Sequence, residues 1–92
     1  MVKALVLYAE EPDPQRYAAH VELCRTVAGG TFRHGPVFGS PTRSGYRYYA
    51  EWEFPDRETF ERAAASPEFA ATGRDALELG APFQVLFADV HG

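Results

Sequence analysis

The sequence contains a single cysteine, Cys24, so no disulfide can form within the chain. It has no pair of cysteines two residues apart and no cysteine–histidine spacing typical of a zinc site. We therefore expect no metal site, and a reducing cytoplasm is the predicted location.

Basic residues are few and scattered: nine lysines and arginines against 13 acidic residues give a net charge of −4. Such a surface cannot neutralise a phosphate backbone, so nucleic acid is not an expected partner. Long apolar runs are also missing, because the run at residues 2–9 ends at Glu10, well short of the roughly 20 residues of a membrane span. Neither a membrane segment nor a cleaved signal is expected.

The length of 92 residues predicts one domain, residues 1–92. A chain of this size leaves a large fraction of its surface unburied. Burial against a second subunit would therefore help to stabilise it.

The first part of the chain predicts a strand and a helix. Residues 2–9 are rich in Val and Leu, which is typical of a central strand. Asp13 and Pro14 then form an N-cap followed by proline at the first helical position. Apolar side chains recur every three or four residues until Gly29, so we expect a helix over residues 14–28.

Two strands joined by a turn are expected next. Residues 31–38 carry aromatic and β-branched side chains but include Gly35 and Pro36, which predicts an edge strand with a bulge. A turn over residues 39–45 leads to residues 46–54, where aromatic and charged side chains alternate. The aromatic face of this strand is expected to face the core.

The last part of the chain predicts a broken helix and a final strand. Asp56 and Ser66 are both N-cap residues, so two consecutive helices should end near Gly80. Residues 83–90 are apolar on both faces and contain no proline, which predicts a strand that must be covered.

The predicted order is strand, helix, strand, strand, helix, strand. This is the ferredoxin-like α+β fold, a four-stranded antiparallel sheet with both helices on one face. A second copy could cover the helix-free face, giving a homodimer with a barrel-like centre, the dimeric α+β barrel. Glu51 and Glu53 would then point toward the partner, where Arg33, Arg43 or Arg47 could pair with them.

Several short motifs support a family resemblance across nearly the whole chain. In order they are VKALVLY at 2–8, DPQRY at 13–17, YYAEWEF at 48–54, ETF at 58–60, SPE at 66–68 and VLFADV at 85–90. This order and spacing resembles the EthD-like family. The resemblance implies a dimeric α+β barrel, in a superfamily that includes cofactor-independent monooxygenases, haem-degrading proteins and muconolactone isomerases. His20 is expected to match the first family histidine, whereas residues 21–30 offer no counterpart to the second.

Five residues are predicted to form a site between helix and sheet. His20 would be the acid–base group, because an imidazole near the inner face of a helix can exchange protons with a ligand. Tyr8, Tyr17, Tyr48 and Trp52 would be the walls around a flat organic molecule. For each of them a purely structural role, as a bonded core histidine or as sheet packing, stays open.

The remaining reactive side chains are expected to be inert. Cys24 falls among core positions with no cation or paired histidine to activate it. His34 and His91 are expected to be exposed, and neither has a second ligand at metal spacing.

The main functional hypothesis is a cofactor-independent oxygenase or isomerase that acts on a small hydrophobic or aromatic molecule. One alternative is a non-catalytic dimer that binds such a ligand or assists another enzyme, which the short segment after His20 favours. Another is a haem-binding protein with His20 as axial ligand.

Overall fold

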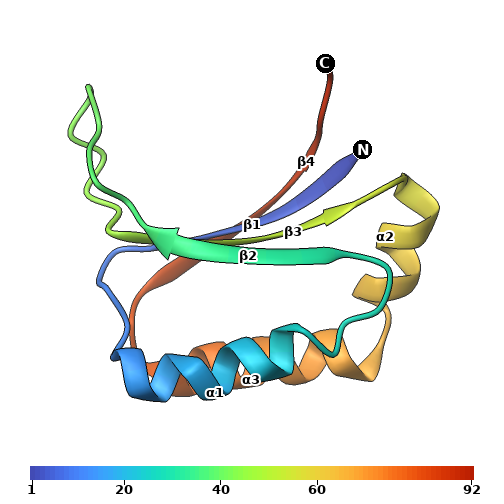
Figure 1. The fold of residues 1–92 in the computed structure, drawn as a ribbon, viewed down its shortest axis with the longest axis horizontal. Helices are drawn as coiled ribbons and strands as arrows, with labels where there is room; N and C mark the ends of the chain where they lie inside the picture. The colour runs from blue at the N-terminus through green and yellow to red at the C-terminus, as the bar shows by residue number, and fades with distance from the viewer.

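The computed structural model describes residues 1–92 and shows a four-stranded sheet with three helices on one side (Figure 1). The elements are β1 (Val2–Tyr8), α1 (Pro14–Cys24), β2 (Thr31–Pro36), β3 (Tyr48–Phe54), α2 (Arg57–Ala64), α3 (Pro67–Leu79) and β4 (Phe83–Asp89). The strand order is β2-β3-β1-β4, and every neighbouring pair is antiparallel. The predicted ferredoxin-like α+β fold is confirmed.

Helix α1 begins as predicted but ends earlier. The Asp13 carboxylate caps the first turn. The helix then stops at Cys24 instead of continuing to the two glycines. The backbone N–H and hydroxyl of Thr26 both donate to the carbonyl of Leu23, at 3.0 and 2.6 Å, which tightens the chain into a turn. This turn carries Val27 into the core.

Strands β2 and β3 pair without the predicted bulge. Their register is continuous along the whole of β2. Pro36 is the last residue of this edge strand, where its missing N–H interrupts no ladder bond. Strand β3 starts at Tyr48 and not at residue 46, because Tyr46 leaves the expected core face and its hydroxyl donates to Gln84.

The two-helix crossover is confirmed. The side chains of Asp56 and Ser66 accept hydrogen bonds from the backbone N–H groups of Thr59 and Phe69, at 2.7 and 3.2 Å. Gly80 ends α3 with φ +80°, in the left-handed region that favours glycine.

The core lies between the helices and one face of the sheet. The indole N–H of Trp52 donates to the carbonyl of Cys24 at 3.0 Å and so pairs a carbonyl at the end of α1. The ring of Phe54 is fully buried and lies against Gly30. A Cβ at that glycine would come within 2.6 Å of the ring, so the close approach requires glycine.

On the helix-free face, the acidic residues of β3 find their partner inside the chain. A guanidinium nitrogen of Arg33 lies 3.1 Å from a carboxylate oxygen of Glu51 and 2.5 Å from one of Glu53. The register places Arg33 directly opposite Glu51. The prediction that these carboxylates need an arginine from a partner is therefore corrected, and Arg43 and Arg47 form no ion pair within the chain.

Strand β4 is an edge strand with exposed apolar side chains on both faces. Val85 and Phe87 point to the helix side and are 44% and 57% exposed, while Leu86 points to the helix-free face and is 48% exposed. The sequence predicted that this strand must be covered, but no other segment of the chain fully covers these side chains.

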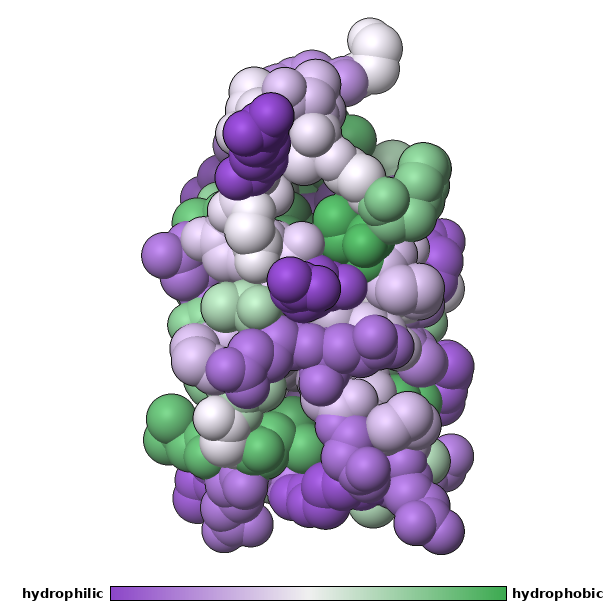
Figure 2. Space-filling view, turned by 90° about the vertical axis from the view of Figure 1, so that its left-hand side faces the viewer, coloured by the Kyte–Doolittle hydropathy of each residue, from purple (hydrophilic) through white to green (hydrophobic).

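The loop between β2 and β3 rises on the side of the sheet opposite the helices (Figure 1). Phe38 in this loop is fully exposed. Seen from that end of the molecule, apolar residues form separate patches, one below the raised loop and one over the helix layer, within a mostly hydrophilic surface (Figure 2). None of the helices has the length and apolar character needed to cross a membrane.

Candidate functional site

The predicted site residues lie in two cavities between helices and sheet, where the sequence predicted one cleft. The inner cavity, of about 70 Å³, lies between α3 and strands β1, β3 and β4. It is lined by Val6, Tyr8, His20, Trp52, Phe69, Thr72, Gly73, Ala76, Phe83 and Val85. The predicted site residues Tyr8, His20 and Trp52 therefore share this cavity.

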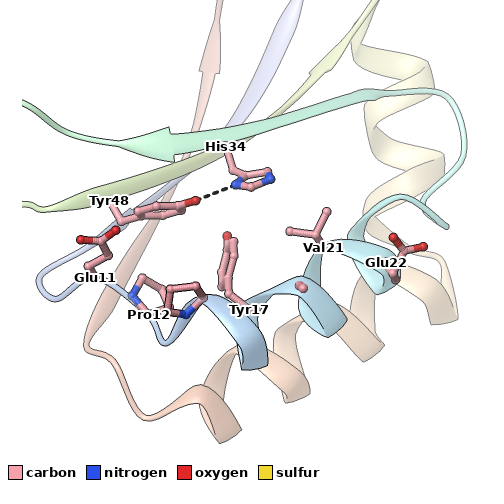
Figure 3. A pocket seen from close by; sticks show the side chains of 9 residues that line it. Glu11, Pro12, Tyr17, Val21, Glu22, His34 and Tyr48 are labelled. Carbon is pink, nitrogen blue, oxygen red and sulfur yellow. Dashed lines mark hydrogen bonds between the residues drawn. The ribbon is translucent and has the colours of Figure 1, made fainter.

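The outer cavity, of about 320 Å³, lies between the start of α1 and the β2 edge of the sheet (Figure 3). It is lined by Glu11, Pro12, Pro14, Tyr17, Ala18, Val21, Glu22, His34 and Tyr48. The other two predicted site residues, Tyr17 and Tyr48, line this cavity and not the one that His20 lines.

His20 is only 3% exposed and is held by a side-chain pair between α1 and α3. Its Nδ1 lies 2.7 Å from a carboxylate oxygen of Asp75. The guanidinium of Arg16 donates to both oxygens of that carboxylate, at 2.6 and 3.2 Å. The arrangement is a chain of three side chains, guanidinium, carboxylate and imidazole, across the contact of two helices.

The Asp75 carboxylate decides which nitrogen of His20 carries the proton. The hydrogen bonds from Arg16 hold the pKa of Asp75 below its usual range, against the opposing effect of burial, so this group is ionised near neutral pH. An ionised carboxylate can only accept, so Nδ1 of His20 must donate to it.

The second ring nitrogen of His20, Nε2, takes no part in this pair. Nε2 has no hydrogen-bond partner in the chain. Because no fully enclosed side-chain nitrogen or oxygen lacks a partner, Nε2 is not fully enclosed, and its ring lines the inner cavity. With Nδ1 protonated, Nε2 can take a proton from a ligand in that cavity.

The other groups around the inner cavity are apolar or already bonded. The hydroxyl of Thr72 donates to the carbonyl of Phe69 at 2.7 Å. Burial raises the pKa of Tyr8, whose hydroxyl accepts a hydrogen bond from Tyr17. The cavity therefore suits an apolar group, with the imidazole of His20 and the hydroxyl hydrogen of Tyr8 as its unpaired polar groups. Gly73 and Val85, both exposed, mark its mouth between α3 and β4.

In the outer cavity, Nδ1 of His34 and the hydroxyl of Tyr48 are 2.7 Å apart (Figure 3). Burial, and then the nearby charge of Arg25, lowers the pKa of His34. Burial also raises the pKa of Tyr48, with a further contribution from Glu11. Both groups are therefore neutral near pH 7.

Tyr17 lies between the two cavities. Its hydroxyl is 3.4 Å from that of Tyr8, and its ring centroid is 5.2 Å from His20, 5.5 Å from His34 and 5.3 Å from Tyr48. It contacts residues of both cavities and separates one from the other.

Sequence reasoning missed three residues of these sites. Arg16 and Asp75 were not identified, because only the packing of α1 on α3 brings them to His20. His34 was expected to be exposed, but it is partly buried, since the unbulged register turns it toward the helices beside Phe32 and Tyr48.

The remaining reactive side chains carry no site. His91 is exposed, as expected. Burial raises the pKa of the Cys24 thiol to about 12, which keeps it protonated and agrees with an inert role. No three histidine, cysteine or acidic side chains gather in an arrangement that could hold a metal ion.

A four-stranded antiparallel sheet in this order, with its helices on one face and cavities between the two layers, defines a ferredoxin-like protein of the α+β class. No protein-family model matches the sequence, and neither does any curated protein.

Solved structures connect the chain to a family within this class. An ethyl tert-butyl ether D (EthD) family protein from Bacillus halodurans is 25% identical, with a TM-score of 0.81 over 99% of each chain. This confirms the resemblance to the EthD-like family. A dimeric ferredoxin-like protein from Jannaschia sp. shares the fold at 20% identity, with a TM-score of 0.74 over 97% of this chain and 98% of its own.

SnoaB, a cofactor-independent oxygenase from Streptomyces nogalater, also has this fold. It is 18% identical, with a TM-score of 0.64 over 99% of this chain and 93% of its own. At this identity the likeness concerns the fold alone. The chain is therefore a ferredoxin-like protein similar to the EthD family, and the reaction has to be argued from the site.

Proposed function

We propose that this protein is a cofactor-independent enzyme that removes a proton from a small hydrophobic or aromatic molecule, with His20 as the base. The observation that carries the proposal is the hydrogen bond from Nδ1 of His20 to the ionised Asp75, which leaves Nε2 unbonded on a ring that lines an apolar cavity. Tyr8 and Trp52 would hold the apolar part of the substrate against the sheet.

The chemistry follows from the charge balance of the pair. When Nε2 takes a proton, the imidazole becomes positive, and the negative charge of Asp75 at 2.7 Å stabilises it. The apolar walls strengthen this attraction, because they exclude water. Return of the proton to another carbon of the substrate gives an isomer. Alternatively, the carbanion forms a C–O bond with molecular oxygen, the second substrate and the oxidant; the resulting peroxide takes the proton from Nε2, and the protein is then an oxygenase.

The comparisons agree with this class of reaction without specifying it. SnoaB shows that the fold can support oxygenation without a cofactor. The base proposed here does not depend on that likeness, because it rests on three side chains of this sequence.

A test that needs no known substrate is base-catalysed exchange of carbon-bound hydrogen. Cyclopentanone is small and apolar, and ¹H NMR in D₂O follows the loss of its acidic protons. We expect the wild-type protein to accelerate this loss and His20→Gln to abolish the acceleration, since general base catalysis contributes about 10²- to 10⁴-fold. The matched control is His91→Gln, which changes an exposed histidine far from the cavity and should leave the rate unchanged.

Equal exchange rates in the wild type and His20→Gln would refute His20 as the base. In that case the inner cavity would be a binding site without catalysis, which is the alternative that the short segment after His20 favours. A Soret band on titration with haem would instead indicate haem binding. The cavity of about 70 Å³ would have to enlarge far more for a haem than for the small molecule proposed here.

We further propose that the protein works as a homodimer through the helix-free face of the sheet. The support is the apolar Leu86, which is half exposed on that face, and the dimeric state of the Jannaschia protein of the same fold. A partner on this face leaves both cavities open, because they lie on the helix side.

A further inference from the structure

The outer cavity has features of a ligand site that the proposed reaction does not use. Its volume of about 320 Å³ falls within the range of small-molecule sites, whereas the inner cavity falls below it. Within it, the hydrogen-bonded pair of His34 and Tyr48 is polar and partly buried on the helix-facing side of the sheet. Neither side chain of this pair forms a hydrogen bond with a backbone group or a third side chain.

The pair can offer a ligand either a donor or an acceptor. One proton lies between Nδ1 of His34 and the hydroxyl of Tyr48. If the phenol donates it, Nε2 carries a hydrogen and is a donor; if Nδ1 donates, the phenol hydrogen turns outward and Nε2 is an acceptor. Since both groups are neutral near pH 7, the matching ligand group is a neutral carbonyl or hydroxyl.

The walls of the outer cavity suit a flat ring. Figure 3 shows Tyr17 rising from α1 below His34 and between Tyr48 and Val21. The ring of Tyr17 meets that of Tyr48 at 73° and that of His34 at 61°, which forms an aromatic corner. An inserted ring could stack on one of these faces and meet the edge of another. Pro12 continues the apolar surface.

The charges at the outer cavity disfavour an anion. Glu11 and Glu22 are exposed at its rim, and no lysine or arginine lines it. The nearby Arg25 is engaged with Phe32, donating to its carbonyl at 3.4 Å and lying 5.8 Å from its ring centroid. A carboxylate entering the cavity would lose water and gain no cation.

We propose that the outer cavity is a binding site for a neutral aromatic molecule that carries a carbonyl or hydroxyl group, which the His34–Tyr48 pair recognises. Binding here does not depend on catalysis at His20, because Tyr17 separates the two cavities and the polar pair is distinct.

Acetophenone and benzoate are suitable probes, since they share the ring and differ in charge. Titration of ¹⁵N-labelled protein, followed by NMR, should show acetophenone shifting the amide signals of Tyr17, His34 and Tyr48 and leaving that of Gly73 unchanged. Benzoate should bind at least about tenfold more weakly. Strongest shifts at Gly73 and Trp52, or equal binding of the two probes, would overturn the proposal.

Two neighbouring tyrosines give a matched pair of variants. Tyr48→Phe removes the hydroxyl of the pair and should weaken acetophenone binding about three- to tenfold, the effect of one hydrogen bond. Tyr49→Phe makes the same change on the opposite face of β3 and should bind as the wild type does. His20→Gln should also leave binding unchanged, which keeps this test separate from that of the reaction. If Tyr48→Phe and Tyr49→Phe bind alike, the polar pair does not recognise the ligand.

Discussion

At the scale of single residues, two glycines have opposite surroundings. Gly73 lies within α3, where a Cβ would meet no atom within 4 Å, whereas a Cβ at Gly30 would lie 2.6 Å from the ring of Phe54. Glycine inside a helix costs about 0.5–1 kcal/mol relative to alanine. Gly73→Ala should therefore raise the free energy of unfolding by about that amount, measured by urea denaturation.

Gly30→Ala should instead lower the free energy of unfolding, by about 1–3 kcal/mol, because the buried ring of Phe54 must move.

Gly73 also tests the position of the cavity mouth. Gly73→Leu adds a long apolar side chain beside Val85 and should slow the hydrogen exchange of cyclopentanone, while Gly73→Ala should change it little. If Gly73→Leu catalysed the hydrogen exchange of cyclopentanone as fast as the wild type, ligands would reach His20 by another route.

At the scale of elements, the side chains Arg16, Asp75 and His20 fasten α1 to α3, and the strength of this contact should depend on pH. The pKa of Asp75 is lowered in the folded protein, chiefly by Arg16. Its contribution to stability is therefore complete above the ordinary aspartate pKa of about 4 and is lost as the pH falls through the lowered value.

Asp75→Asn should accordingly destabilise the protein at pH 7 by about 1–2 kcal/mol. The hydrogen bonds from the partly buried Arg16, which lower the Asp75 pKa most, and from the buried His20 both contribute to this loss. The difference from the wild type, measured by urea denaturation at several pH values, should shrink below about pH 4. Asp89→Asn, which breaks an exposed pair with Arg57, should have a much smaller effect at pH 7. A difference that stays constant from pH 7 to pH 2 would contradict this role for Asp75.

The same contact shows which features of the elements the sequence can predict. The caps of Asp13, Asp56 and Ser66 were predictable, because each depends on residues three positions apart. The pairing of His20 with Asp75 spans 55 positions and depends on how two helices pack, so no local pattern indicates it. Likewise, the division into two cavities depends on where the ring of Tyr17 lies.

The bulge predicted in β2 was wrong for a related reason, because it too depends on contact with another element. Gly35 and Pro36 are typical of a bulge when taken alone, but pairing with β3 keeps the register continuous and turns His34 inward. Alternation along β3 identified the core positions Trp52 and Phe54, because period-2 patterns need only the strand itself. Residue propensities therefore predicted the features that depend on one element alone and failed for those that depend on pairing with a second element.

At the scale of the whole molecule, β4 offers neighbouring residues that separate the two faces of the sheet. Leu86 points to the helix-free face and Val85 to the helix side, and their exposed fractions are similar. If the homodimer forms through the helix-free face, Leu86→Glu places a charge in an apolar interface and should convert dimers to monomers. Val85→Glu adds the same charge on the other face and should leave the dimer intact.

Sedimentation velocity at micromolar concentration distinguishes these outcomes, with circular dichroism to show that both variants are folded. A monomeric wild-type protein would contradict the proposed homodimer. Dissociation by Val85→Glu alone would place the interface on the helix side instead. A dimer sensitive to Leu86→Glu alone would explain why Leu86 is half exposed in a single chain of 92 residues, because the second sheet would cover the helix-free face.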